Sequence, residues 1–123
     1  MRPLTLSIRG LRSYTGACSI DFSDRSLVAI IGDTGVGKSS ILEAITYALY
    51  NSPTWTAGEV KPLIADGVQT MSVELVFLAD GKRWKVHRST SRGPHPPPLH
   101  RIECLDDPEL IPVTGEELVR RQV

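Results

Sequence analysis

The sequence has few of the features that mark secreted or membrane proteins. Only two cysteines, Cys18 and Cys104, occur in 123 residues, and they lack the spacing of metal ligands. A disulfide scaffold would need more cysteines, so we expect free thiols in a reducing compartment. No apolar run approaches the roughly 20 residues that cross a bilayer. We therefore expect neither secretion nor membrane insertion, and a cytoplasmic location.

Neither sign of charge predominates. The chain has 14 basic and 14 acidic residues and a formal net charge of zero, which argues against a protein that coats a polyanion. The hydrophobic content of 41% and the charged content of 23% are those of an ordinary globular chain. The three histidines, His87, His95 and His100, lack the rhythm of a metal site, so we predict none of them as a ligand.

The sequence does contain a phosphate-binding loop in fitting surroundings. The pattern G-x-x-x-x-G-K-S starts at Gly32, after an apolar strand predicted at Leu27–Ile31 and before a predicted helix. Its glycines let successive backbone N–H groups turn toward phosphate oxygens. Lys38 supplies a charge for the β and γ phosphates, and the Ser39 hydroxyl supplies a ligand for Mg²⁺. We therefore expect this segment to bind a nucleoside triphosphate with Mg²⁺. The residues of the loop are Gly32, Asp33, Thr34, Gly35, Val36, Gly37, Lys38 and Ser39.

Two strands are predicted before the loop and one helix after it. Alternation predicts a half-buried strand from Leu4 that stops at Gly10, and a second strand at Ala17–Phe22. The helix after Ser39 is expected to end at Asn51–Pro53, because proline removes a hydrogen-bond donor. The residues predicted on its buried stripe are Ile41, Leu42, Ile45, Ala48 and Leu49, with Glu43 and Thr46 on the other side.

The second half of the chain predicts a hairpin. After a loop with a short helix near Glu59–Ile64, two alternating runs extend from Met71 to Arg88 around Asp80–Gly81, which is a strong hairpin signal. The same residues resemble an apolar strand followed by a metal-binding aspartate. We reject that interpretation, because Lys82 follows where a catalytic glutamate would stand. Another strand is expected near Arg101–Leu105, and Thr114 has the form of a helix cap.

Basic residues concentrate in this half of the chain. Between Gly81 and Ile102 there are six lysines or arginines and no acid. Two interpretations stay open: a nucleic-acid surface, or charges that protect an exposed edge strand from pairing. The residues we take as candidate DNA contacts are Arg83, Lys85 and Arg88.

Several segments together resemble one family. They are Ile8–Tyr14, Ile20–Phe22, the loop and helix from Gly32 to Ile45, and Ala48–Tyr50. In this combination they resemble the head segment of SbcC, the SMC-like ATPase subunit of a nuclease that processes broken or hairpin DNA ends. The resemblance is closest between Leu4 and Tyr50, extends over the hairpin and fades after Arg92.

The resemblance implies roles that the residues alone do not. Arg12 and Ser13, which by themselves suggest a solvated turn, would reach the nucleotide from the loop between the first two strands. Ser40 would join the phosphate cradle. The implied cofactors are ATP and Mg²⁺. The implied partners are the C-terminal half of the head, a second head in a homodimer, an SbcD-like nuclease and DNA, with no membrane.

The predicted fold is α/β. Residues 1–123 would form the N-terminal lobe fragment of a P-loop NTPase of the ABC-type ATPase head, with a mixed sheet and an antiparallel hairpin, before the glutamine loop and the coiled coil. The family is one of ATPases, but the carboxylate that hydrolysis needs is missing from these residues, so we predict no catalytic residue here and no turnover by the chain alone. Three alternatives stay open: another head of the SMC, RecF or RecN type, a small-molecule P-loop kinase, or a non-catalytic nucleotide-binding module.

Overall fold

A computed structural model of the chain describes residues 2–12, 14–22, 38–51, 60–107, 109–110 and 112–114. These residues contain strands, one α-helix and one short 3₁₀ helix. The elements are β1 (Arg2–Leu11), β2 (Tyr14–Asp21), α2 (Lys38–Tyr50), η1 (Lys61–Leu63), β3 (Thr70–Ala79), β4 (Lys82–Ser91), β5 (Leu99–Cys104) and β6 (Val113–Thr114).

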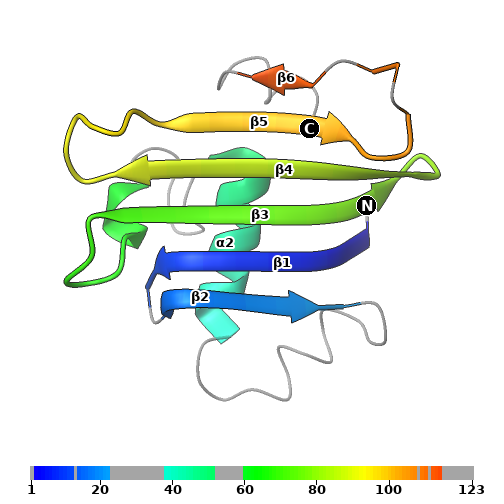
Figure 1. The fold of residues 1–123 in the computed structure, drawn as a ribbon. Coiled ribbons are helices and arrows are strands. Elements are labelled where there is room, and N and C mark those ends of the chain that lie inside the picture. Colours follow the sequence, from blue (N-terminus) through cyan, green and yellow to red (C-terminus); the bar gives the residue numbers. More distant parts are fainter. Residues whose placement is uncertain are drawn as a thin grey trace.

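The strands form one six-stranded sheet in the order β2-β1-β3-β4-β5-β6 (Figure 1). Each of these neighbouring pairs is antiparallel. Strand β1 lies between β2 and β3, so the chain leaves the sheet after β2 and returns to the other side of β1. The strand expected at Leu27–Ile31, which would make the sheet mixed, lies outside the described residues.

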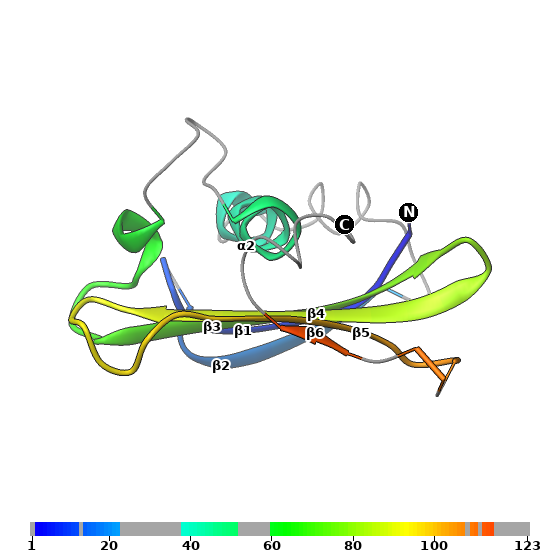
Figure 2. The same cartoon turned by 90° about the horizontal axis from the view of Figure 1, so that it is seen from above.

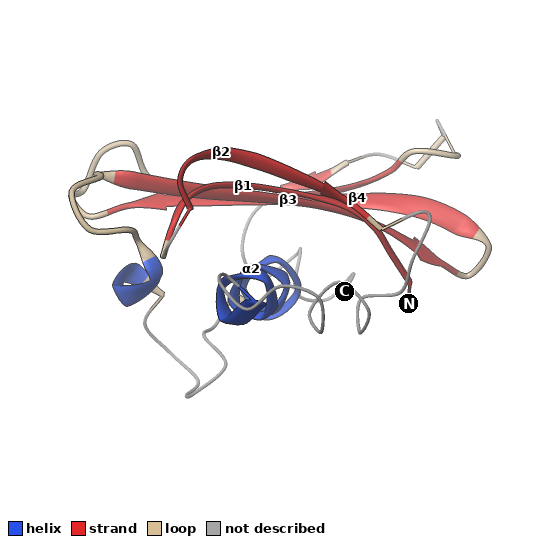
Figure 3. Ribbon diagram, turned by 90° about the horizontal axis from the view of Figure 1, so that it is seen from below, coloured by secondary structure: helices blue, strands red, loops and turns tan. Residues whose placement is uncertain are grey.

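Helix α2 and η1 lie on the same face of this sheet (Figures 2 and 3). We call this the helix face and the opposite one the open face. Alternate strand residues point to opposite faces, and those on the helix face are mostly apolar and buried. The core includes Leu6, Ile8, Leu11, Phe22, Met71, Val73, Leu75, Phe77, Val86 and Ile102 from the sheet side, and Ile41, Ala44, Ile45, Tyr47, Ala48 and Leu49 from the helix.

The predicted hairpin is confirmed. Strands β3 and β4 pair from Thr70↔Ser91 to Ala79↔Lys82. The two turn residues, Asp80 and Gly81, have φ values of 55° and 74°, as a two-residue type I′ turn requires. Asp80 is exposed at the tip of this turn, which agrees with its rejection as a metal ligand.

Strand β1 extends one residue beyond its predicted end. Gly10 has a φ of 73°, and the pairing register shifts between Arg9 and Leu11. A Cβ atom at Gly10 would collide with the carbonyl oxygen of Thr70. Glycine is therefore required here, and it produces a bulge rather than the end of the strand.

The helix is confirmed, with a correction to its buried face. Ile41, Ile45, Ala48 and Leu49 of the predicted stripe are buried, whereas Leu42 is 43% exposed. Glu43, expected on the outer side, is only 5% exposed. Glu43 and Tyr47, which are one turn apart on the flank of the helix away from Leu42, are both buried, so the buried face of α2 is wider than the predicted stripe.

The helix ends as predicted. Asn51 has a φ of 54° and donates its N–H to the carbonyl of Tyr47 at 2.9 Å. This left-handed residue closes the last turn, because it redirects the chain and satisfies a terminal carbonyl. Among the helices described in the structure, none is long and apolar enough to cross a membrane.

Candidate functional site

The predicted phosphate loop meets the described structure at the start of α2. Residues 32–37 lie outside the described residues, and so does Ser13. Lys38, Ser39 and Ser40 form the beginning of α2, which has 13 residues. The first N–H groups of a helix have no intrahelical acceptor and carry the positive end of the helix dipole. An anion held by residues 32–37 would therefore meet the N-terminus of α2.

The opposite end of α2 is fixed by a buried arginine. Arg88 of β4 is 0% exposed, and its Nε donates to the carbonyl of Ala48 at 2.8 Å. Its Nη2 lies 3.5 Å from the carbonyl of Leu49, and its Nη1 lies 2.8 Å from Nδ1 of His100 on β5. The negative end of the helix dipole thus faces a cation supplied by the sheet.

Arg12 lies at the tight turn between β1 and β2, where the resemblance places a nucleotide contact. It is exposed, has a φ of 49°, and donates its N–H to the carbonyl of Leu63 at 2.8 Å. Ala65 in turn donates to the carbonyl of Gly10 at 2.7 Å. The turn is therefore supported by the last residue of η1 and the segment that follows it, and not only by its own strands.

Arg92 holds this supporting segment in place. Its Nε donates to the carbonyl of Val68 at 2.9 Å, and its Nη2 donates to the carbonyls of Ile64 and Ala65, both at 3.1 Å. One guanidinium thus donates hydrogen bonds to three carbonyls of the segment that supports the Arg12 turn. Sequence reasoning counted Arg92 only as one of the basic residues, and no local pattern identifies this role.

The other basic residues between Gly81 and Ile102 are matched with carboxylates. Arg83 donates to both oxygens of Asp106, with the closest contact at 2.7 Å. Lys85 lies 2.9 Å from Glu103 and 3.3 Å from Glu74. Two further pairs are Lys82 with Asp107 at 3.2 Å and Arg101 with Glu103 at 3.7 Å. All six basic residues between Gly81 and Ile102 therefore have partners within the chain.

These pairs change the ionisation of their members. The hydrogen bond from Arg83 holds the pKa of Asp106 below its ordinary value. The hydrogen bond from Lys85 lowers the pKa of Glu103, and the same contact raises the pKa of Lys85. Each pair thus favours the charged form of both partners.

Two expectations about the basic stretch are wrong. Arg88 was a candidate DNA contact, but it is fully buried and directed at α2. The interpretation as edge protection also fails, because β4 lies between β3 and β5 and is not an edge strand. Of the three candidate DNA contacts, Arg83 and Lys85 alternate with the core residues Trp84 and Val86, which places them on the open face.

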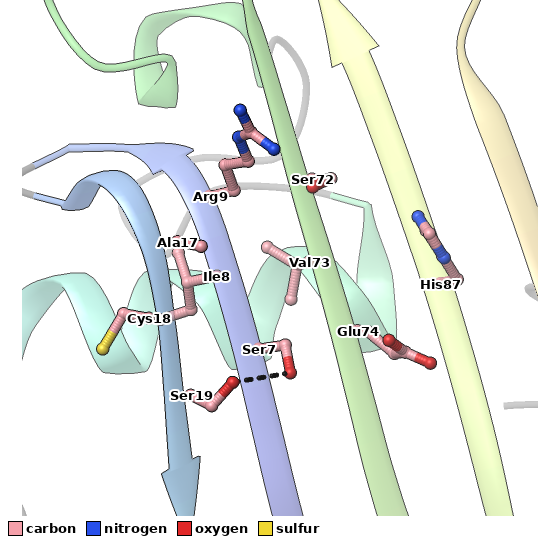
Figure 4. Close-up of a pocket in the computed structure, with 10 residues that line it drawn as sticks. All are labelled: Ser7, Ile8, Arg9, Ala17, Cys18, Ser19, Ser72, Val73, Glu74 and His87. Atoms are coloured by element: carbon pink, nitrogen blue, oxygen red, sulfur yellow. Dashed lines mark hydrogen bonds between the residues drawn. The ribbon is translucent and has the colours of Figure 1, made fainter.

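A shallow hollow of about 110 Å³ lies on the open face (Figure 4). Short side chains form much of it, and Ser7 Oγ lies 3.3 Å from Ser19 Oγ. Arg9 stands on one side, and Glu74 and His87 stand on the other, with α2 behind the strands. The hollow is therefore separated by the sheet from the helix that follows the phosphate loop.

Acidic, histidine and cysteine side chains are the usual metal ligands in proteins. Within the described ranges, no three such residues lie together as a metal site would require. Cys18 and Cys104 are free thiols, as predicted.

The chain has relatives of known family. It matches the AAA domain family over residues 5–103. It is 41% identical over 93 residues to the SbcC subunit of nuclease SbcCD from Deinococcus radiodurans, which covers 75% of this chain and 10% of that protein. It is also 39% identical over 90 residues to a probable DNA double-strand break repair Rad50 ATPase of Aquifex aeolicus, covering 72% of this chain and 9% of that one. The chain thus spans about a tenth of the length of the curated relatives it matches.

A solved structure shares the fold. The SMC head domain from Thermotoga maritima superposes with a TM-score of 0.57 and 24% identity, over 99% of this chain and 42% of that one. The fold of β1 to β6 with α2 is therefore that of part of an SMC head domain.

Proposed function

The chain belongs to the AAA domain family, as an SbcC- and SMC-like ATPase head segment, and from this premise we propose that it binds ATP with Mg²⁺ through residues 32–40. The observation that carries the proposal is the position of α2. The helix begins at Lys38, directly after the glycine-rich residues, and its other end is bonded to the sheet through Arg88. The N-terminal end of α2 is the one that adjoins the predicted loop.

The chemistry of the proposed site follows from its residues. Backbone N–H groups at the start of α2 and in residues 32–37 would bind phosphate oxygens. Lys38 would neutralise the β and γ phosphates, and the hydroxyl of Ser39 would bind Mg²⁺. Arg12, with Ser13, would approach the nucleotide from the β1–β2 turn. Bound Mg-ATP supplies the phosphoanhydride whose cleavage releases free energy.

The wider activity is proposed from the relatives. One is named as a component of the nuclease SbcCD and another as a double-strand break repair ATPase. We propose that residues 1–123 act with the C-terminal half of the head, in a dimer of two heads. ATP hydrolysis there would be coupled to the processing of DNA ends by an SbcD-like nuclease. The chain's own contribution is to bind the triphosphate and to position it.

DNA contacts are proposed for Arg83 and Lys85 only. Both lie on the open face and both are ion-paired. Exposed ion pairs contribute only about 0–1 kcal/mol each. A DNA phosphate could therefore replace the carboxylate partner of Arg83 or Lys85 at low cost.

Binding of Mg-ATP to the 123-residue chain tests the central proposal. Lys38→Ala should weaken binding by about 10-fold or more, because loss of a hydrogen bond to a charged group costs about 1.5–3 kcal/mol. Lys82→Ala is the matched control, since Lys82 is paired with Asp107 in the hairpin region and should leave the affinity unchanged. Titration calorimetry of the three proteins gives the comparison. Equal affinities, within about threefold, for wild type and Lys38→Ala would contradict the proposed site.

A further inference from the structure

Among the charged side chains that the structure describes, Arg88 is the most deeply buried. It is 0% exposed and lies on the helix face of β4, between the core residue Val86 and the buried Thr90. Arginine is rarely buried completely unless its donors are matched. The groups that match it include the carbonyl of Ala48 at 2.8 Å, the imidazole of His100 at 2.8 Å and, more distantly, the carbonyl of Leu49.

The contact with His100 defines the state of that imidazole. A guanidinium has only hydrogen-bond donors, so Nδ1 of His100 accepts from Nη1 of Arg88. The ring is therefore neutral, with its proton on Nε2. His100 is itself buried on β5, so Arg88 connects the end of α2 to two adjacent strands.

The hydrogen bonds from Arg88 satisfy carbonyl groups in the last turn of α2, which have no partner within the helix. The last four carbonyls of a helix have no intrahelical donor, and Ala48 and Leu49 are among them. A cation at this end also opposes the helix dipole favourably. Asn51 closes the same turn through the carbonyl of Tyr47. The C-terminus of α2 is therefore bonded to β4 and β5 at a defined point.

We propose that Arg88 is a positioning residue for nucleotide binding, acting through α2. The proposal rests on the function proposed above. Ala48 is ten residues beyond Lys38, or about 15 Å along the helix, so Arg88 does not touch the phosphates. Arg88 fixes the position of the C-terminus of α2 on the sheet. Because the helix is rigid, the position of its N-terminus is fixed as well. Without Arg88 the helix can shift along the apolar face, and the phosphate-binding N–H groups shift with it.

The first test compares substitutions at Arg88 with a matched core substitution. Arg88→Met keeps much of the volume and removes the donors, whereas Arg88→Lys keeps the charge. Val86→Ala lies on the same face of the same strand, is equally buried, and lowers stability without removing a bond to α2. All proteins are the 123-residue chain, compared under conditions where denaturation curves show each to be fully folded.

We expect Arg88→Met to weaken Mg-ATP binding at least fivefold, with partial recovery in Arg88→Lys. Val86→Ala should bind within twofold of wild type despite its lower stability. An affinity for Arg88→Met within twofold of wild type, or an equal loss in Val86→Ala, would overturn the proposal.

Hydrogen exchange without nucleotide gives a second readout. Amides of residues 41–44, near the start of α2, should exchange at least fivefold faster in Arg88→Lys than in Val86→Ala. Equal exchange in the two variants would overturn the inference even if neither binds nucleotide. Failure of the wild-type chain to bind Mg-ATP contradicts the proposed function instead, and leaves the exchange result to decide the role of Arg88. If Arg88→Met does not fold, Arg88→Lys and His100→Leu, which removes the acceptor for Nη1, provide the same comparison.

Discussion

Arg83 and Asp106 are joined by a two-pronged ion pair across 23 positions of sequence, with Nη2 and Nε of the guanidinium both donating to the carboxylate. The backbone N–H of Arg83 also donates to Asp106 at 2.7 Å. This pair lies where the linear sequence shows only positive charge. The net charge of the folded surface around the hairpin is therefore much closer to zero than the net charge of its linear sequence.

Reversal of charge at Arg83 and Lys85 tests the proposed DNA contacts. In a complete head that contains this chain, Arg83→Glu with Lys85→Glu should weaken DNA binding more at low salt than at high salt. Removal of each phosphate interaction should reduce the slope of log affinity against log salt by about 0.9 on duplex DNA. Fluorescence anisotropy at four or five salt concentrations measures the slope.

The control for this experiment is Lys61→Glu, which reverses an exposed charge on η1, on the helix face. It should leave the salt slope unchanged. If the double variant has the slope of wild type, the ion pairs of Arg83 and Lys85 serve only to join strands.

The carboxylate partners predict a dependence of stability on acid pH. The pKa values of Asp106 and Glu103 are lowered in the folded state by hydrogen bonds from Arg83 and Lys85 respectively. Groups with a lowered pKa stabilise the fold at pH values above their unfolded pKa, which is 3.8 for Asp and 4.5 for Glu. That stabilisation is lost as the pH falls through the lower, folded values.

Denaturation midpoints at pH 6.0 and pH 3.0 measure the loss. The wild type should lose more stability over this interval than Asp106→Asn with Glu103→Gln, because the double variant has no such protons to take up. Parallel losses in the two proteins would show that these pairs contribute nothing to the folded state.

Local chemistry explains which parts of the fold were predictable. The β3–β4 hairpin was predicted because its turn depends on two adjacent residues, Asp80 and Gly81, which tolerate positive φ values. The start of α2 after the glycine-rich loop and its end at Asn51 were predictable for the same reason. The position of β1 between β2 and β3 was not, because it depends on pairing between distant segments.

A count of basic residues along the sequence does not show which of them are buried or which have partners. Trp84, Val86 and Arg88 are each two residues apart, so the period of a strand places all three on one face. The signal that Arg88 is buried was therefore present, but a positive charge in a basic run was taken as a surface charge. The partners of Arg83 and Arg92 could not be found this way, since they depend on the register of β4 with β5 and on the path after η1.

The hydroxyl of Tyr47 offers a test of core polarity. Tyr47 is 0% exposed, and in the part of the chain that the structure describes its hydroxyl has no hydrogen-bond partner. Burial raises its pKa, so the group is neutral. Tyr47→Phe should raise the free energy of unfolding by about 1 kcal/mol, because an unsatisfied polar atom is removed from the core.

Tyr50→Phe is the matched control, since Tyr50 is 60% exposed on the same helix and should change stability by less than about 0.5 kcal/mol. Urea denaturation of both variants gives the difference. A loss of stability in Tyr47→Phe would mean that its hydroxyl is bonded in solution.

Alanine substitutions at three glycines distinguish the cost of backbone strain from the cost of steric collision at the bulge before Arg12. Gly16 lies in β2 with open space where a Cβ would stand, Gly67 has a φ of 83° and open space, and Gly10 has a φ of 73° and the carbonyl of Thr70 in the way. Substitution by alanine should therefore have little effect at Gly16. It should cost about 1–2 kcal/mol at Gly67, from left-handed backbone alone. At Gly10 overpacking adds about 1–3 kcal/mol to that strain.

The bulge at Gly10 also sets the position of the turn that carries Arg12. Relief of the collision with Thr70 would have to move β1 away from β3, and the hydrogen bond from Ala65 to the Gly10 carbonyl would move with it. Gly10→Ala should therefore weaken Mg-ATP binding by more than Gly67→Ala, even where both proteins remain folded. Urea denaturation of the three variants measures the order of their stability losses, and calorimetric titration measures the order of their affinities for Mg-ATP. Equal stability losses at Gly10 and Gly67 would show that β1 and β3 adjust freely at the bulge. Equal affinities would show that the position of the Arg12 turn does not affect nucleotide binding.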